Sequence, residues 1–443
     1  MSVTEHQLWG GETAKAVENF PVSGERVPVP VIRWLGRIKG TAAAVNGELG
    51  LLESDVAERI ARAGYEIAEG KHDDQFPIDV FQTGSGTSSN MNANEVIAEL
   101  AGDEAHANDH VNMGQSSNDV FPSAVHLAAV AETHDKLLPA LERLSGSLGG
   151  KSKEFANLVK AGRTHMMDAV PVTLGQEFAG YAAQIRLGRE RVQAALPRAS
   201  QIPLGGTATG TGLNTHPEFA ERVRAKIAED TGVPIDGPAE PFEAQGNRDA
   251  LVELSGALKV VAVSLTKIAS DLVLMGSGPR TGLTELQLPE LQKGSSIMPG
   301  KVNPVIPEVV LQVAAQVIGN DMAITVAGSQ GAFELNVRVP VIARNLLESI
   351  TVLTSGSHML AEKCIDGLEP NEEALTRHAE STPAIATALN PFIGYDKGTE
   401  IVQEAVASKR TIREVAIEKG VDEETLDRAL DLKAMADGSK PSA

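Results

Sequence analysis

The chain has 443 residues, of which 42% are hydrophobic, 3% aromatic and 22% charged. This apolar fraction can fill a sizeable core and excludes general disorder, and the length predicts about three domains. Lys and Arg number 39 and Asp and Glu number 59, so the net charge is −20. Such a charge argues against nonspecific binding to nucleic acid or to an anionic membrane, but it permits a local site for a small anion.

The compartment is predicted from the cysteine content and from the N-terminus. Cys364 is the single cysteine, so it can neither form an intramolecular disulfide nor supply the several thiolates of an iron–sulfur cluster. Residues 1–6 contain neither the basic nor the apolar part of a secretory signal. We expect no apolar stretch of the roughly 20 residues that span a bilayer. A cytoplasmic protein without a membrane partner is therefore predicted.

The chain is predicted to be mostly α-helical, because aromatic residues are few and apolar residues repeat with a period near 3.6. The clearest repeat is a heptad seam from Leu251 to Met275, which is typical of a helix buried against other long helices. Apolar residues from Leu127 to Leu144 also follow helical spacing. Further long segments rich in apolar residues complete a predicted set of five long helices: 172–197, 305–329 and 341–364.

The long helices divide the chain into three predicted domains. Shorter helices and loops rich in Gly, Ser and Asn are expected before about residue 116, and short charged segments after about residue 370. We therefore predict a mostly helical N-terminal domain over 1–116 and a central long-helix bundle over 117–370. A small helical C-terminal domain over 371–443 would follow.

One predicted helix carries a polar stripe at i+4 steps, formed by Glu308, Gln312, Gln316 and Asn320. A solvated helix face would explain this pattern. The rest of the helix is apolar nearly all round, however, so the stripe could also be buried. A buried stripe needs hydrogen-bond partners, in an active site or a subunit interface.

Three polar loops could bind a carboxylate. The densest is 294–304, where two serines and two glycines are combined with Lys301 and Asn303. Hydroxyl, amide and ammonium groups and successive backbone N–H groups all suit an anion. The segments 83–92 and 115–119 place hydroxyl and amide side chains ahead of helices, whose N-termini also attract anions. On composition alone, ordinary loops with helix caps would be favoured.

Gly162–His165 places an imidazole beside the Thr164 hydroxyl, just before a long helix. A lone histidine is more often structural than catalytic. A carboxylate that fixed its tautomer would favour a catalytic role, and Glu308 is the candidate partner.

Two other segments are interpreted as structural. The glycine-rich segment 205–212 lacks the strand–turn–helix context of a nucleotide loop and predicts a tight turn or a strand pair. No motif with metal-ligand spacing is present, and 106–110, with His, Asn, Asp and His, is the nearest approach to one. We therefore predict that the protein holds no metal.

Taken together, these segments resemble the fumarase/aspartase superfamily over essentially the whole chain, and within it the class II fumarate hydratases. The eleven-residue stretch GSSIMPGKVNP at 294–304 resembles the superfamily's signature loop, and a match of this length is highly specific. TGSGT at 83–87 and QSSND at 115–119 look like the fumarate hydratase forms. Aspartate ammonia-lyases usually carry Ala in the first of these motifs and Thr in the second. Further similar blocks lie at 162–165, 174–178 and 205–214.

The resemblance implies the L-aspartase/fumarase-like fold, in which the long five-helix bundles of a homotetramer form a 20-helix core. It implies the reversible hydration of fumarate to (S)-malate, a step of the tricarboxylic acid cycle. Water would add in the anti sense through an aci-carboxylate intermediate. The implied partner is a small dicarboxylate, and the resemblance implies neither a cofactor nor a metal.

Residue by residue, the resemblance implies that Ser295, on a mobile loop, takes the C3 proton of malate. His165, paired with Glu308, would handle the water or hydroxyl. The residues implied to bind substrate are Ser85, Gly86, Thr87, Ser116, Ser117, Asn118, Thr164, Ser296, Lys301 and Asn303. A second anion site would involve His106, Asn108 and Asp109, but the sequence His-Ala-Asn-Asp-His at 106–110 departs there from the family's His-Pro-Asn-Asp-Asp.

Two alternatives to a fumarate hydratase remain. The first is an ammonia-lyase or a hydratase of a substituted fumarate such as mesaconate. The second is a catalytically inactive structural protein, since this superfamily fold has been reused in that way. The intact set of Ser295, His165, Lys301 and Glu308 argues against the second alternative.

Overall fold

The computed structural model describes residues 7–438 and is mostly helical, as predicted. The chain divides into two compact units, each made of three stretches. Unit 1 comprises Met1–Pro139, Gly188–Val263 and Val313–Ser355. Unit 2 comprises Ala140–Leu187, Ser264–Gln312 and Gly356–Ala443. These units cut across the three domains expected from the sequence, and that threefold division stays a prediction.

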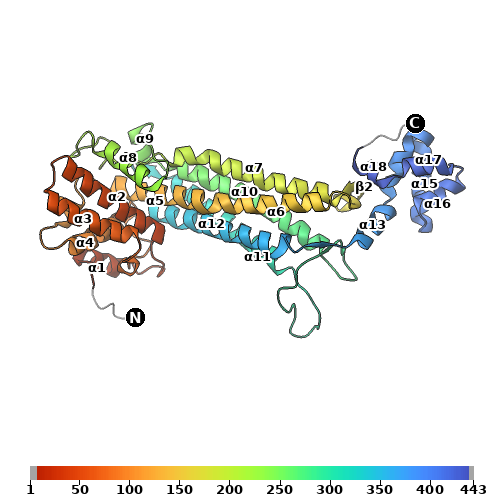
Figure 1. Cartoon of the computed structure of the whole chain (residues 1–443), viewed down its shortest axis with the longest axis horizontal. Coiled ribbons are helices and arrows are strands. Elements are labelled where there is room, and N and C mark those ends of the chain that lie inside the picture. The colour runs from red at the N-terminus through yellow and green to blue at the C-terminus, as the bar shows by residue number, and fades with distance from the viewer. Residues whose placement is uncertain (1–6, 439–443) are drawn as a thin grey trace. The chain divides into compact units, whose positions relative to one another are not determined.

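Unit 1 begins with four helices connected by loops (Figure 1). They are α1 (Gly11–Asn19), α2 (Val29–Glu48), α3 (Ser54–Ala68) and α4 (Thr87–Ala101), with short helical turns η1 (Asp73–Gln75) and η2 (Ala107–Val111). All four are shorter than the five long helices, as expected, and α2 is the longest of the four with 20 residues. Most of this helix is buried, which allows it to pack against α3 on one side and α5 on another.

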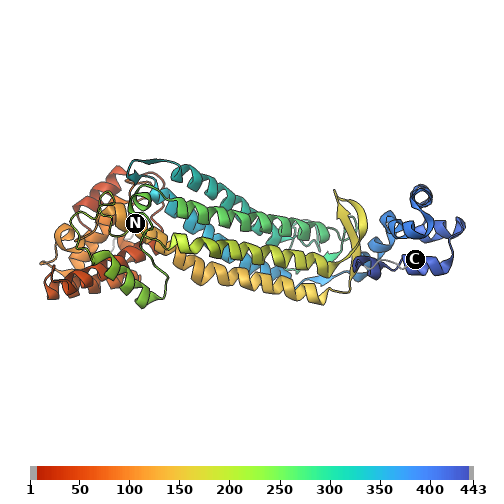
Figure 2. The same ribbon diagram turned by 90° about the horizontal axis from the view of Figure 1, so that it is seen from above.

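The five long helices are confirmed. Helix α5 (Ser117–Glu132) continues through η3 (Thr133–Leu137) into α6 (Leu138–Glu154). The others are α7 (Leu174–Ala199), α10 (Asp249–Met275), α11 (Val305–Gly328) and α12 (Val339–Leu360), which continues into η4 (Ala361–Ile365). Within each unit their segments run side by side (Figures 1 and 2). The heptad seam lies in the core: Leu251, Leu258, Leu265 and Leu272 are fully buried.

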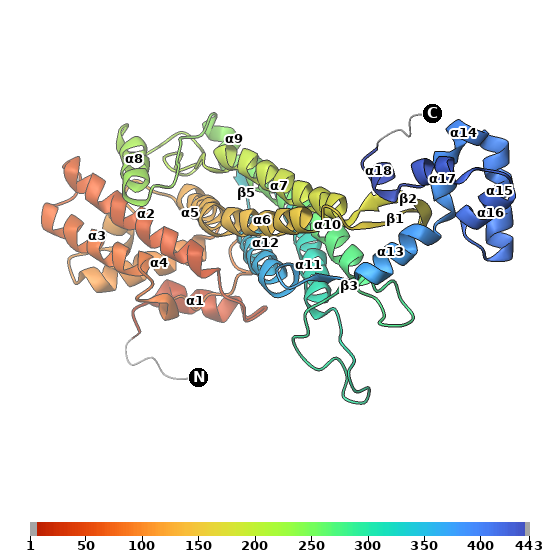
Figure 3. The same ribbon diagram turned by 45° about the vertical axis from the view of Figure 1, so that its right-hand side comes forward.

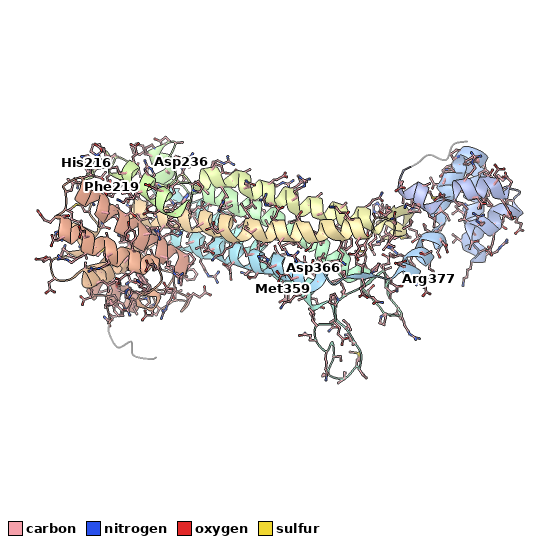
Figure 4. All side chains as sticks on the ribbon, in the orientation of Figure 1. His216, Phe219, Asp236, Met359, Asp366 and Arg377 are labelled. Atoms are coloured by element: carbon pink, nitrogen blue, oxygen red, sulfur yellow. The ribbon has the colours of Figure 1, made fainter. Side chains whose placement is uncertain are left out.

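Shorter elements complete unit 1. Helices α8 (Phe219–Thr231) and α9 (Pro241–Gly246) precede α10, and strands β4 (Gly331–Ala332) and β5 (Leu335–Asn336) form a small hairpin between α11 and α12. Phe219, at the start of α8, is fully buried, and His216 precedes it (Figure 4). The segment 205–212 forms tight turns, in which Gly205, Gly210 and Gly212 have positive φ, as expected.

Unit 2 contains an antiparallel hairpin of β1 (Val159–Thr164) and β2 (Met167–Thr173), and a small pair of β3 (Leu286–Gln287) with β6 (Glu369–Pro370). Helix α13 (Glu372–Ser381) contacts β1. The helices that follow it pack around a small apolar core of their own. They are η5 (Pro383–Leu389), α14 (Asn390–Ile393), α15 (Tyr395–Ser408), α16 (Ile412–Glu418), α17 (Glu423–Ala429) and α18 (Leu432–Ala436) (Figure 3). Asp366 follows η4 directly (Figure 4). Arg143 of α6 donates to it across 2.5 Å.

Helix α11 corrects the expectation about apolar stretches. Among the described residues it is the one helix long and apolar enough to cross a membrane, by length and composition alone. The polar residues of the stripe divide the helix into short apolar runs, so the sequence did not indicate one continuous apolar stretch. Core helices pass the same test, and only 33% of the most apolar part of α11 is buried within the chain.

The polar stripe of α11 fits each of its two interpretations in part. Asn320 is buried, and its Nδ2 donates to Glu348 Oε2 (2.9 Å) and to Ser349 Oγ (3.1 Å) of α12. The side chain of Gln316 also donates to Glu348 Oε2, across 3.3 Å. Glu308 and Gln312 are exposed. Asn320, at one end of the stripe, is therefore buried with hydrogen-bond partners, whereas Glu308, Gln312 and Gln316 are exposed within the chain.

Candidate active site

The first candidate segment, TGSGT at 83–87, forms the N-terminus of α4 in unit 1. Glycine is required twice in this turn. A Cβ on Gly84 would lie 1.7 Å from the carbonyl oxygen of Val337, and one on Gly86 would lie 2.2 Å from the Phe121 ring. Gly86 also has φ +78°, which favours glycine. The backbone thus presses against its neighbours, and this places Ser85 and Thr87 at the start of the helix.

A chain of hydroxyls connects this helix end to the N-terminus of α5. Ser85 Oγ lies 2.8 Å from Thr87 Oγ1, which lies 2.8 Å from Ser117 Oγ. Ser116 caps α5 by accepting from the backbone N–H of Asn118 (3.2 Å). Helices α4 and α5 therefore bring their N-termini and their hydroxyl groups together. This arrangement suits an anion, because helix N-termini carry partial positive charge and free N–H groups.

Asp119 holds the N-terminus of α5 in place, although the sequence gave no indication of this role. Its side chain is fully buried and accepts three backbone N–H groups. The donors are Ser116 N (2.9 Å), Gly205 N (3.0 Å) and Thr207 N (2.9 Å). Asp119 thereby connects the cap of α5 to the 205–212 turns, and Asn118 Nδ2 adds a bond of 3.0 Å to the Ala208 carbonyl.

Burial raises the pKa of the Asp119 carboxyl to about 6, although the three backbone hydrogen bonds and the charge of Lys39 act to lower it. Lys39, on α2, is itself fully buried. Burial lowers the pKa of the Lys39 ammonium to about 7, although the charge of Asp119 acts to raise it. Lys39 Nζ donates to Gln115 Oε1 (3.2 Å) and Asn112 Oδ1 (3.3 Å). A buried ammonium thus supports the segment that precedes Ser116.

Lys39 was missed by sequence analysis, although a signal was available. It falls at helical spacing with Ile32, Leu35 and Ala42, all buried, so it occupies an apolar face of α2. A lysine on such a face is expected to find buried partners.

The second candidate segment, GRTH at 162–165, lies at the end of the β1–β2 hairpin in unit 2. The register shifts between Ala161 and Arg163, and a Cβ on Gly162 would lie 2.4 Å from the Val170 carbonyl oxygen. Thr164 pairs with Met167, and the two residues between them have positive φ, His165 at 55° and Met166 at 62°. The turn therefore presents Thr164 and His165 at an exposed tip.

The third candidate segment is the loop 288–304 of unit 2, which extends away from the helices of that unit (Figures 1 and 3). Ser295 Oγ accepts from the backbone N–H groups of Ile297 (3.1 Å) and Met298 (3.0 Å). Asn303 Nδ2 donates to the Gly294 carbonyl (2.7 Å) and Gly294 N donates to the Lys301 carbonyl (2.9 Å). The Ser295 oxygen thus lies where two N–H donors would stabilise negative charge on it.

Much of this loop is exposed within one chain. Ser296 and Lys301 are exposed, and the apolar side chain of Ile297 is 84% exposed. Within the described residues of a single chain, no hydrogen bond or ion pair joins His165 to Glu308. That pairing stays a prediction.

The segment predicted as a second anion site is exposed and makes its hydrogen bonds within itself. His106 Nδ1 accepts from Asp109 N (3.1 Å) and lies 3.0 Å from Asp109 Oδ2. His110 occupies the position where the family pattern has Asp. Its Nδ1 accepts from the backbone N–H of His106 (3.0 Å). The second anion site stays a prediction. Across residues 7–438, no group of three or more His, Cys, Asp or Glu side chains is placed to hold a metal ion.

The three segments share one chemistry. Each presents hydroxyl, amide or backbone N–H donors, and the loop adds the ammonium of Lys301. Unit 1 brings its donors together, whereas unit 2 holds the hairpin and the loop as separate exposed features. The set can bind carboxylates and stabilise a negative charge that develops on one of them.

Comparison with known proteins gives the same assignment. A family described as Lyase matches residues 1–319, and one described as Fumarase C C-terminus matches residues 385–437. A fumarate hydratase class II from Corynebacterium efficiens is 55% identical, over 98% of this chain and 94% of that protein. Its namesake from Mycobacterium tuberculosis is 56% identical, over 97% and 92%.

Among solved structures, a recombinant class II fumarase from Schistosoma mansoni has a TM-score of 0.96 and 38% identity. The match covers 98% of this chain and 96% of that one. The fold and the polar loops therefore define a lyase. Within the lyases, the chain belongs to the class II fumarate hydratase family.

The buried Asp119 generates a prediction about stability. Its pKa of about 6 in the folded protein lies above the ordinary 3.8, so the folded state binds this proton more tightly than the unfolded chain does. Asp119 should therefore lower the free energy of unfolding by roughly 2–3 kcal/mol as the pH rises from about 4 to about 6. Asp119→Asn removes this titration. Its free energy of unfolding relative to wild type should increase over the same pH range, as measured by urea unfolding.

The control is Asp103→Asn, at an exposed loop position. This variant should follow the pH dependence of the wild type. A difference between Asp119→Asn and wild type that stays constant with pH would contradict the account.

Proposed function

We propose that the protein catalyses the reversible hydration of fumarate to (S)-malate, as a step of the tricarboxylic acid cycle. The observation that carries the proposal is the Ser295 hydroxyl, held by two backbone N–H donors on a loop that also presents Lys301 and Asn303. Family membership supports it. The proposed location of the enzyme is the cytoplasm.

The difficult step is the removal of a C–H proton next to a carboxylate. In the malate-to-fumarate direction, Ser295 as an alkoxide takes the C3 proton, and the electron pair moves into the neighbouring carboxylate to form a dianionic aci-carboxylate. The hydroxyl on C2 then leaves as water, with a proton supplied by His165. The electron pair returns from the aci-carboxylate to form the double bond of fumarate.

The site must stabilise the added negative charge with donors that are already in place. One chain would bind the substrate carboxylates through residues of its unit 1. These are Ser85, Gly86, Thr87, Ser116, Ser117 and Asn118. Thr164, Ser296, Lys301 and Asn303 would supply the other donors. Removing one preorganised donor of this kind typically raises the barrier by about 3–4 kcal/mol. Glu308 would hold His165 in the tautomer that the proton transfer needs.

The assembly is proposed to be a homotetramer in which each site combines segments of different chains. Two observations support this proposal. The hairpin and the loop are exposed in one chain, and α11 leaves large apolar side chains uncovered. These are Val309, Ile318, Met322 and Val326, and an uncovered apolar face of this size is typical of an interface.

The function is tested by assaying the purified protein with malate, fumarate and aspartate. Interconversion of malate and fumarate is expected, with little release of ammonia from aspartate. Rapid deamination of aspartate without malate turnover would identify an ammonia-lyase instead. Absence of turnover with all three substrates would favour a structural protein or a substituted substrate such as mesaconate, which is tested next.

Ser295→Ala should lower kcat by at least ~10²-fold, because it removes the oxygen that takes the proton. The fold should persist, since Ser295 lies on a loop outside the helical core. The control is Ser408→Ala, which loses a hydroxyl that bonds only within α15, to the Glu404 carbonyl. Near-normal kcat in Ser295→Ala would contradict the assignment of the base.

Met322→Glu tests the assembly, because it places a charge on a side chain of α11 that is 65% exposed in one chain. If other copies of the chain cover this face, the variant would bury an unpaired charge in the interface. The tetramer should then dissociate, and activity should be lost with it. The matched control is Val406→Glu on α15, at a side chain 59% exposed. Light scattering gives the mass, and a fully active monomer would refute the shared site.

A further inference from the structure

In unit 2, a cluster of charged side chains surrounds a buried carboxylate and includes two residues of the β1–β2 hairpin. The Glu285 cluster consists of Lys160, Arg163, Glu177, Glu285 and His378. Glu285 is its centre, and its side chain is fully buried. The members come from β1, α7, α13 and the segment that precedes β3.

Glu285 binds three groups on its two oxygens. Arg163 donates to both, with Nη2 at 2.7 Å from Oε1 and Nη1 at 3.2 Å from Oε2. Lys160 Nζ lies 3.0 Å from Oε2, and His378 Nδ1 lies 3.0 Å from Oε1. Burial raises the pKa of the Glu285 carboxyl, but the hydrogen bond from Arg163 and the charge of Lys160 outweigh it and hold the pKa below its ordinary value.

The bidentate bond fixes the residue that immediately precedes Thr164 and His165. The register shift at Gly162 allows the backbone to change direction there, and the side chain of Arg163 then lies half-buried against Glu285. The turn itself is strained, since both His165 and Met166 have positive φ. A strained turn needs a firm anchor to keep one conformation, and the Arg163–Glu285 pair lies one residue away.

The backbone of Glu285 fixes a second catalytic feature. Glu285 N donates to the Met275 carbonyl at the end of α10 (2.8 Å), and its carbonyl accepts from Asn371 N (3.0 Å). Strand β3 follows at once and pairs with β6. The loop that carries Ser295 begins after β3, so Glu285 also holds the root of this loop.

Stability alone does not explain the cluster. A buried ion pair contributes little net stability, because desolvation of the charges offsets most of their attraction, and apolar residues of the same volume often serve as well. A planar guanidinium bound by both oxygens of a carboxylate does fix direction, however. A fixed orientation is what a proton-transferring imidazole two residues along the chain requires.

We propose that Glu285 is a positioning residue for the reaction. Its carboxylate acts through Arg163 to hold the turn that presents Thr164 and His165, while its backbone holds the root of the Ser295 loop. This inference rests on the proposed function and adds a residue that does not touch the substrate.

The test compares Glu285→Gln with Glu177→Gln in the full-length protein. Both variants remove a carboxylate that contacts Lys160, since Glu177 Oε2 lies 2.7 Å from Nζ, but only Glu285 contacts Arg163. Glu285→Gln should lower kcat by ~10- to 100-fold, whereas the kcat of Glu177→Gln should stay within about threefold of wild type. In Glu285→Gln the KM should change less than kcat, because the hydroxyl groups of unit 1 keep their share of substrate binding when the turn that presents Thr164 loosens.

Arg163→Met completes a double-mutant cycle. If Glu285 acts through Arg163, adding Glu285→Gln to Arg163→Met should lower kcat by less than twofold more, because neighbours that share one role are not additive. Equal losses of kcat in Glu285→Gln and Glu177→Gln, or fully additive losses in the cycle, would overturn the proposal.

Hydrogen exchange of the backbone amides of residues 162–167 separates this inference from the proposed function. Glu285→Gln should raise exchange there at least tenfold, and Glu177→Gln should not. If Glu285→Gln raises exchange but the wild-type protein does not hydrate fumarate, the anchoring of the turn is upheld and the proposed function is rejected. Unchanged exchange and unchanged kcat in Glu285→Gln would reject the anchoring itself.

Discussion

In each unit, one buried carboxylate holds the polar segments of the candidate site in place. Asp119 in unit 1 and Glu285 in unit 2 are both fully buried. A buried carboxylate is costly unless its oxygens are occupied by donors, so the groups that bind it cannot move away freely. In both units some of these donors belong to the polar segments themselves, Ser116 in one case and Arg163 in the other. Each unit therefore holds its polar segments in place where the proposed site would bind an anion.

The proposed site would allow a protein with a net charge of −20 to bind a dianion. Such a site does not depend on the overall field of the molecule. Hydroxyl groups, backbone N–H groups and helix N-termini would supply the attraction locally, and Lys301 would add a single positive charge. Donors fixed before the substrate arrives do not reorganise when charge develops, so they would favour the aci-carboxylate over the bound substrate.

The sequence was sufficient to predict the long helices and the polar loops, because both are local patterns. The heptad seam from Leu251 to Met275 predicted a core helix, and that helix is buried as expected. Glu285 could not be predicted in the same way. Its partners Arg163 and His378 lie 122 and 93 residues away, and no local pattern indicates that they meet. Lys39 lies between these cases, since its place on an apolar helix face was visible but its amide partners were not.

We propose that segments distant in the sequence meet, across neighbouring copies of the chain, around one small diacid. A crystal structure of the assembled protein with fumarate bound would show whether they do. We expect one fumarate in contact with Thr87 and Ser117 of one copy, with Thr164 and His165 of a second and with the 294–303 loop of a third. Fumarate bound elsewhere, or contacted by only one of these three segments, would contradict it.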